Sequence, residues 1–78
     1  GIVEASAKFK WDKVDDAKGY KIYWRDTTSP TWDYSRYVGD VTEFILEGIV
    51  IDNYFFGISS VGKNGFESPV VFPNSVFR

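Results

Sequence analysis

The chain has 78 residues, no cysteine and no histidine, and its nine basic and eleven acidic residues give a net charge of -2. This length makes one small domain, residues 1–78, which buries only about 60% of its unfolded surface. The composition excludes disulfides and thiolate metal sites, and the scattered charges argue against a nucleic-acid partner. No apolar stretch approaches the ~18 residues of a membrane-spanning helix, so we expect no membrane insertion.

Short segments in which apolar and polar residues alternate follow one another along the chain. Alternation with a period of two predicts half-buried antiparallel strands. The expected strands, in chain order, are residues 7–12, 19–26, 32–38, 42–50, 53–61 and 67–73. Their inward faces predict a core of Trp11, Tyr20, Ile22, Trp24, Phe44, Leu46, Tyr54, Phe56 and Ile58. Six or seven short strands without a helix predict an all-β fold, a sandwich of two antiparallel sheets.

Turn-forming residues separate these segments. Residues 26–31 contain Pro30 and predict a turn-rich connection. Asn64-Gly65 predicts a hairpin turn with positive φ at both central positions. Pro69 cannot donate a hydrogen bond, so residues 67–73 are expected to form an edge strand. Residues 74–78 are expected to be a tail.

The order of the aromatic and turn residues between Phe9 and Phe72 resembles that of a fibronectin type III domain. The residues that carry the resemblance are Trp11, Gly19, Tyr20, Ile22, Trp24, Arg25, Phe44, Leu46, Tyr54, Ile58, Ser60, Val61, Asn64, Gly65, Glu67, Ser68 and Pro69. The resemblance implies an immunoglobulin-like sandwich in which strands 19–26 and 53–61 are adjacent. It also implies that the Tyr54 hydroxyl bonds to the backbone across a corner. Two departures are a missing proline before Tyr54 and a first strand that is shortened to residues 2–4 or absent.

A narrower resemblance lies in residues 23–44 and 52–73, which are similar to the fibronectin-type module at the C-terminus of bacterial secreted di-zinc aminopeptidases. This resemblance implies an accessory module of a larger hydrolase, located in the periplasm or outside the cell. None of that family's catalytic or metal-binding residues can be placed on this chain.

Few residues of this chain are suited to catalysis. The absence of histidine removes the usual general base and the commonest zinc ligand. Asp12, Asp15 and Asp16 share a loop, where aspartates favour turns, and a weak calcium site is the alternative interpretation. Glu43 and Glu47 alternate with inward apolar residues and are expected to be solvated. We therefore expect no catalytic residue, no cofactor and no metal site, and no enzyme activity from this chain by itself.

A second aromatic face is predicted on the side of the sheet that points away from the core. If Tyr54 and Phe56 face inward, Phe55 faces outward, and Tyr23 on the adjacent strand is expected across from it. The candidate interaction surface consists of Lys21, Tyr23, Arg25, Trp32, Tyr37 and Phe55.

Three interpretations of this face remain open from the sequence. The rings stabilise the sheet by cross-strand pairing, or they dock onto the catalytic domain of a parent chain, a second copy or another protein. Alternatively, they form a flat platform that stacks the sugars of a glycan. A docking patch is apolar with a polar rim, whereas a sugar platform needs coplanar exposed rings beside unpaired polar side chains.

Overall fold

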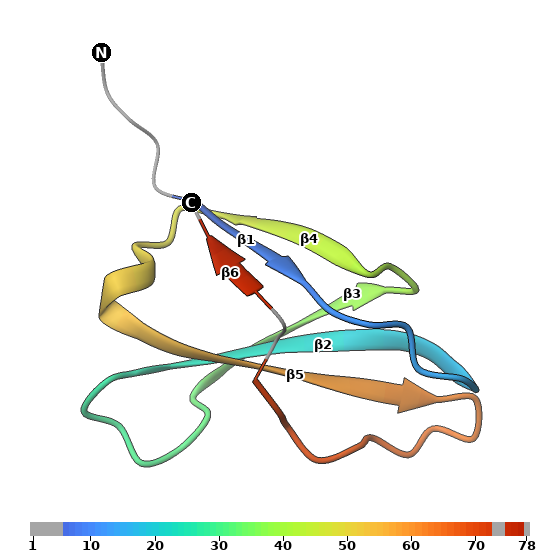
Figure 1. The fold of residues 1–78 in the computed structure, drawn as a ribbon. Helices are drawn as coiled ribbons and strands as arrows, with labels where there is room; N and C mark the ends of the chain where they lie inside the picture. The colour runs from blue at the N-terminus through green and yellow to red at the C-terminus, as the bar shows by residue number, and fades with distance from the viewer. Residues whose placement is uncertain (1–5, 73–74, 78) are drawn as a thin grey trace.

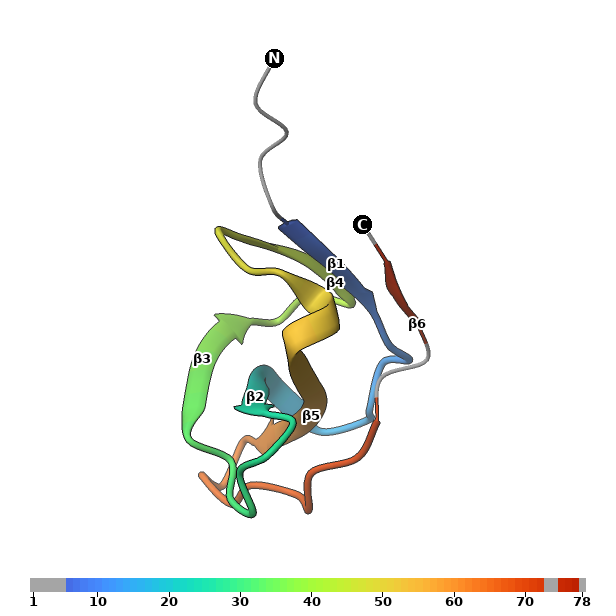
Figure 2. The same cartoon turned by 90° about the vertical axis from the view of Figure 1, so that its left-hand side faces the viewer.

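Two antiparallel sheets of three strands each form the computed structural model, which describes residues 6–72 and 75–77 (Figure 1). One sheet has the order β4-β1-β6, made of Glu43–Glu47, Ser6–Lys10 and Ser75–Phe77. The other has the order β3-β2-β5, made of Tyr34–Gly39, Ala17–Asp26 and Tyr54–Gly62. One turn of 3-10 helix, η1 at Ile51–Asn53, leads into β5. Figure 2 shows the two sheets as separate layers, so the predicted all-β sandwich is confirmed.

The core lies between the two layers and follows the alternation of the strands. Its buried apolar residues are Ala7, Phe9, Trp11, Ala17, Tyr20, Ile22, Leu46, Ile49, Phe56 and Ile58. Phe9 of β1 meets Phe56 of β5 edge to face, with ring centroids 5.0 Å apart, and so joins the two sheets. Of the predicted core residues, Trp24, Phe44 and Tyr54 are only partly buried and pack around the cluster.

The long pairing of β2 with β5 confirms the adjacency that the sequence resemblance implied. Ile22 lies opposite Ile58, and both side chains are buried in the core. Because neighbouring residues point to opposite faces, the residues on either side of this pair point away from the core. The β2–β5 register therefore fixes which side chains form the outer face of the sheet.

The predicted edge strand at residues 67–73 is wrong as a regular strand. The segment follows β5 but pairs with it only at two isolated bridges, Val61 with Glu67 and Ile58 with Val71. Between them, Ser68 accepts the Ser60 N–H through its side-chain Oγ, at 2.9 Å, instead of through a carbonyl. Beyond Ser68, both Pro69 and Val70 lie opposite the single residue Ser59 before pairing resumes at Val71, so this extra residue interrupts the regular ladder.

The turn after β5 differs from the predicted type. Gly65 has a φ of 88°, but Asn64 does not adopt a positive φ. The Gly65 N–H bonds to the Gly62 carbonyl at 2.8 Å, and the Gly62 N–H bonds to the Phe66 carbonyl at 2.8 Å. This pattern is a three-residue loop in which glycine takes the left-handed position.

Two further expectations require correction. Ser75–Phe77 is not a tail, because it forms β6 and pairs antiparallel with β1. The Tyr54 hydroxyl forms no hydrogen bond with any residue that the structure describes; instead, the Tyr20 hydroxyl accepts the Val14 N–H at 2.8 Å. The shortened first strand expected at residues 2–4 lies outside the described residues.

Candidate interaction surface

All six residues of the predicted surface lie on the side of the β3-β2-β5 sheet that points away from the core, which we call the outer face. Lys21 lies opposite Tyr37 of β3 and Ser59 of β5, and Arg25 lies opposite Phe55. Trp32, which precedes β3, reaches this face as well, because its ring lies 6.3 Å from that of Tyr23. The strand register thus brings together residues that are 16 to 38 positions apart in the sequence.

Tyr23 and Phe55 do not face one another as expected. The register places Gly57 opposite Tyr23 and Arg25 opposite Phe55. The alternation gave the correct face for both rings, but it does not determine how far one strand slides along another. Phe55 therefore contacts a guanidinium group, whose carbon lies 5.5 Å from its ring centre, and its side chain remains 45% exposed.

The centre of the outer face is filled by two side chains that pack over Gly57. A Cβ atom at this position would lie 2.3 Å from Val70 Cγ1 and 3.1 Å from the Trp32 ring. Val70 comes from the segment that follows β5, so this contact also holds that segment against the sheet. Only a residue without a side chain permits such close packing.

Tyr37 occupies the end of the outer face away from Phe55. Its ring covers Gly19, where a Cβ atom would lie 2.0 Å from the Tyr37 hydroxyl oxygen. That hydroxyl donates to the Lys18 carbonyl at 3.3 Å. Tyr37 is therefore on the predicted face but is separate from the cluster around Trp32 and Phe55.

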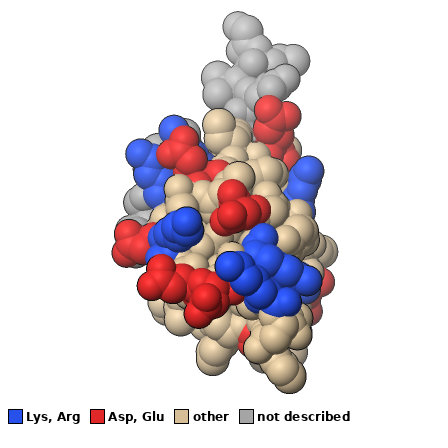
Figure 3. Space-filling model, turned by 90° about the vertical axis from the view of Figure 1, so that its right-hand side faces the viewer, with Lys and Arg blue, Asp and Glu red and all other residues tan. Residues whose placement is uncertain are grey.

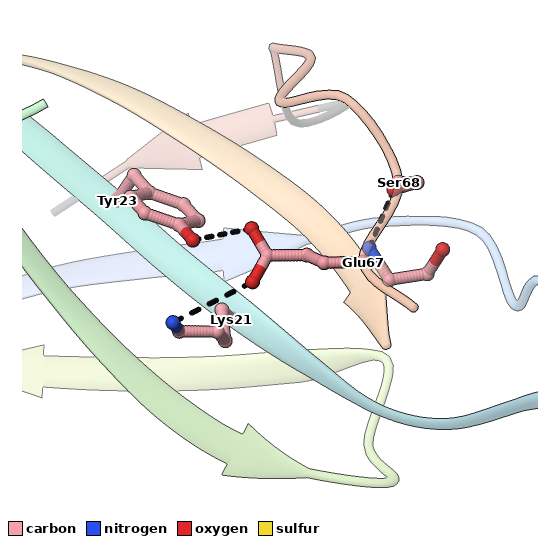
Figure 4. Close-up of polar contacts among 5 residues, drawn as sticks. Lys21, Tyr23, Glu67 and Ser68 are labelled. Carbon is pink, nitrogen blue, oxygen red and sulfur yellow. Dashed lines mark hydrogen bonds and ion pairs between the residues drawn. The ribbon is translucent and has the colours of Figure 1, made fainter. Parts of the chain in front are cut away.

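A polar network on the outer face ties the segment after β5 to β2. Figure 4 shows Tyr23 and Lys21 converging on the Glu67 carboxylate. The Tyr23 hydroxyl donates to Glu67, and Lys21 Nζ lies 3.5 Å from the second carboxylate oxygen. The Tyr23 bond, together with the Lys21 charge, lowers the pKa of Glu67. Burial and the bond to Glu67 raise the pKa of Tyr23.

Acid should weaken this network and lower the stability of the fold. Because the folded pKa of Glu67 is lowered, its contribution is complete above the ordinary value of 4.5 and is lost as the pH falls through the folded pKa. Because the pKa of Tyr23 is raised, its contribution is complete below 10.0 and is lost at higher pH. We expect Glu67→Gln to cost about 1 kcal/mol at neutral pH and to flatten the acid decline. Urea denaturation at a series of pH values measures both effects.

Glu43→Gln is the matched control for that experiment. Glu43 lies 3.9 Å from Lys10 Nζ in a pair whose side chains are half exposed, and such pairs stabilise little. The variant should keep the acid decline of the wild type. Equal pH profiles for the wild type and Glu67→Gln would contradict the assigned role of Glu67.

A cleft that was not predicted lies between the residues that follow β1 and the segment that follows β5. It measures about 230 Å³, and its walls include Trp11, Ile58 and Val71. Trp11 Nε1 is buried without a hydrogen-bond acceptor in the part of the chain that the structure describes. Nearby, Phe66 and Phe72 are 77% and 78% exposed. The alternation of apolar and polar residues carries no signal for this cleft.

The described residues offer neither a cluster of metal ligands nor a membrane-spanning helix. They contain no group of three or more Cys, His, Asp or Glu side chains that could hold a metal ion. No described helix is long and apolar enough to cross a membrane. Figure 3 shows positive and negative side chains interspersed on the face in view, without a basic stripe.

Comparisons with known proteins show that this chain is similar to a part of longer polypeptides. It is 43% identical over 68 residues to a "Probable zinc metalloprotease" of Pyricularia oryzae, covering 81% of this chain and 13% of the relative. Proteins with the same name from Pyrenophora tritici-repentis and Phaeosphaeria nodorum are 44% and 42% identical over 71 residues. These matches cover 86% of this chain and 16% and 14% of the relatives.

No family model matches the chain, and no solved structure matches it. The three relatives are fungal, so the bacterial origin implied by the sequence resemblance finds no support. The chain is thus similar to a small part, 13% to 16%, of these longer proteins named as probable zinc metalloproteases.

Proposed function

We propose that this chain is a non-catalytic, fibronectin type III-like accessory module of a secreted zinc-dependent aminopeptidase, and that its outer face docks onto the catalytic domain. The observation that carries the proposal is the partly exposed aromatic cluster around Trp32 and Phe55, which has a charged rim. Interfaces are enriched in aromatic residues and arginine, and their apolar centres are bordered by polar groups. The share of the relatives' length supports a much larger parent chain to dock against.

The geometry favours docking over glycan binding. Tyr23 and Trp32 are inclined at 58°, so these two rings do not make a flat platform for a sugar. Three polar groups of this face, Tyr23, Lys21 and Glu67, are already engaged with one another. A sugar platform needs hydroxyl-binding side chains that are free. Retention of the chain on a glycan column that Trp32→Ala abolishes would support the glycan alternative instead.

Phe55→Ser in the intact parent polypeptide tests the docking proposal. Replacing the ring removes apolar contact area, so the docked state should become less populated. Energy transfer between one dye on the catalytic domain and one on Lys63→Cys, in the turn after β5, reports the docked fraction. We expect the ratio of docked to undocked molecules to fall at least about fivefold, equivalent to about 1 kcal/mol.

Ile45→Ser provides the matched control. Ile45 is 53% exposed and lies on the outer side of the opposite sheet, where Lys8 is its register partner. This variant loses a comparable exposed apolar side chain and should leave the docked fraction unchanged. Equal signals from the wild type and Phe55→Ser, or equal losses in both variants, would contradict docking through the outer face.

A further inference from the structure

Arg25 occupies an unusual position on the outer face, between two aromatic rings. Its guanidinium carbon lies 5.0 Å from the Trp32 ring and 5.5 Å from the Phe55 ring. Cation–π attraction and the planar shape of the group favour this stacked arrangement. Stacking between rings restricts the guanidinium without using its N–H donors, which point outward in the plane of the group.

Most of these donors have no acceptor in the structure. A guanidinium has five N–H groups. Among the described residues, one acceptor is present, the Ser29 carbonyl, 3.1 Å from Nη1. Nε is buried without an acceptor. No described residue accepts a hydrogen bond from Nη2, and Arg25 as a whole is only partly buried.

Asp33, the acidic side chain whose charge interacts with Arg25, forms its hydrogen bonds with other residues. Asp33 accepts hydrogen bonds from the Ser29 hydroxyl at 2.5 Å and the Thr31 hydroxyl at 2.6 Å. These two bonds, with a smaller contribution from the Arg25 charge, lower the pKa of Asp33. No ion pair joins Arg25 to an acidic side chain in the described part of the chain. By contrast, the other cation on this part of the face, Lys21, is paired with Glu67.

We propose that Arg25 is the anchor of the docking face and that it binds a carboxylate side chain of the parent's catalytic domain. The inference rests on the proposed docking function and adds the chemistry of the contact. A planar carboxylate matches the paired N–H groups of Nη1 and Nη2 and complements the unpaired positive charge. Docking of an acidic residue here would also cover the exposed Phe55 ring beside it. Trp32 and Phe55 act as positioning residues that hold the guanidinium plane.

Substitution of Arg25 in the intact parent polypeptide tests this proposal. Arg25→Lys keeps the charge but loses the planar fork, and Arg25→Gln loses both. We expect the docked-to-undocked ratio to fall at least about tenfold in both variants, because the partner carboxylate is left without its bidentate donor. In the wild type the ratio should fall as salt rises from about 0.05 to 1 M, whereas Arg25→Gln should lose most of that dependence.

Arg36→Lys is the matched control, because Arg36 also stacks on an aromatic ring, 5.3 Å from the centre of Phe44. It should leave the docked ratio and its salt dependence unchanged. Near-ultraviolet circular dichroism verifies that each variant is folded. If Phe55→Ser disrupts docking but Arg25→Lys and Arg25→Gln do not, the carboxylate contact is wrong and docking stands.

If none of these variants changes the ratio, both proposals fail. A signal that depends on protein concentration would overturn the assignment to the catalytic domain in favour of a second copy. A salt dependence that persists in Arg25→Gln would place the electrostatic contact at another residue and also overturn the proposal.

Discussion

Phe9→Ala is expected to remove a large part of the stability of this fold. Phe9 is 1% exposed, lies opposite Phe44 in the β1–β4 register and meets Phe56 across the sandwich. Truncation of a buried phenylalanine costs about 3–5 kcal/mol, because the transfer term and the cavity term add. A domain of this size has only about 4–12 kcal/mol in total. Urea denaturation of the chain should therefore show a midpoint at least about 1 M lower than that of the wild type.

Phe66→Ala is the control for Phe9→Ala. Phe66 is 77% exposed, so its truncation should change the free energy of unfolding by no more than about 0.5 kcal/mol. A loss of less than about 1.5 kcal/mol for Phe9→Ala would mean that the two sheets do not share the core described here.

Gly57→Ala should have the second largest effect, although adding a methyl group to a strand is usually favourable. The new Cβ would lie 2.3 Å from Val70 Cγ1, and Val70 has a short, branched side chain that cannot swing away. Overpacking of this kind costs about 1–3 kcal/mol. We also expect the segment after β5 to separate from the sheet, which urea denaturation and proteolysis near Val70 can measure.

Gly19→Ala tests whether the cost comes from Val70 rather than from the loss of glycine itself. The new Cβ at Gly19 would approach the Tyr37 hydroxyl oxygen at 2.0 Å, but that atom is the far end of a side chain that can move outward. This variant should lose only the bond from Tyr37 to the Lys18 carbonyl, at a cost of about 1 kcal/mol or less. Equal effects of the two substitutions would contradict the packing described over Gly57.

The alternation of apolar and polar residues predicted the strands of both sheets well, because a strand that buries one face has an apolar residue at every second position. Ile22 and Ile58 were placed inward and are buried. The failures lie where backbone hydrogen bonds, and not burial, decide the structure. Ser68 replaces a backbone acceptor with its hydroxyl, and Gly65 alone takes the left-handed conformation of its turn. Neither event changes the pattern of apolar residues, so the pattern could not reveal it.

The membership of the outer face could be predicted, but its contacts could not. Successive side chains of a strand point to opposite faces, so the position of a residue along its strand determines its face. This rule placed Arg25 and Phe55 on the correct face. Contacts depend on the register between strands, which the β2–β5 pairing sets over its whole length. The position of Trp32 before β3 depends on a loop, and the role of Glu67 depends on a segment that crosses back over the sheet.

Hydroxyl-radical footprinting of the intact parent polypeptide tests most directly whether the outer face is the docking surface. Three exposed phenylalanines among the residues of described burial give an internal comparison, since Phe55 is 45% exposed, Phe66 77% and Phe72 78%. Docking through the outer face predicts that Phe55 is protected well below the level set by its exposure, while Phe66 and Phe72 react freely. A reactive Phe55, or protection of Phe66 and Phe72 in its place, would contradict the account.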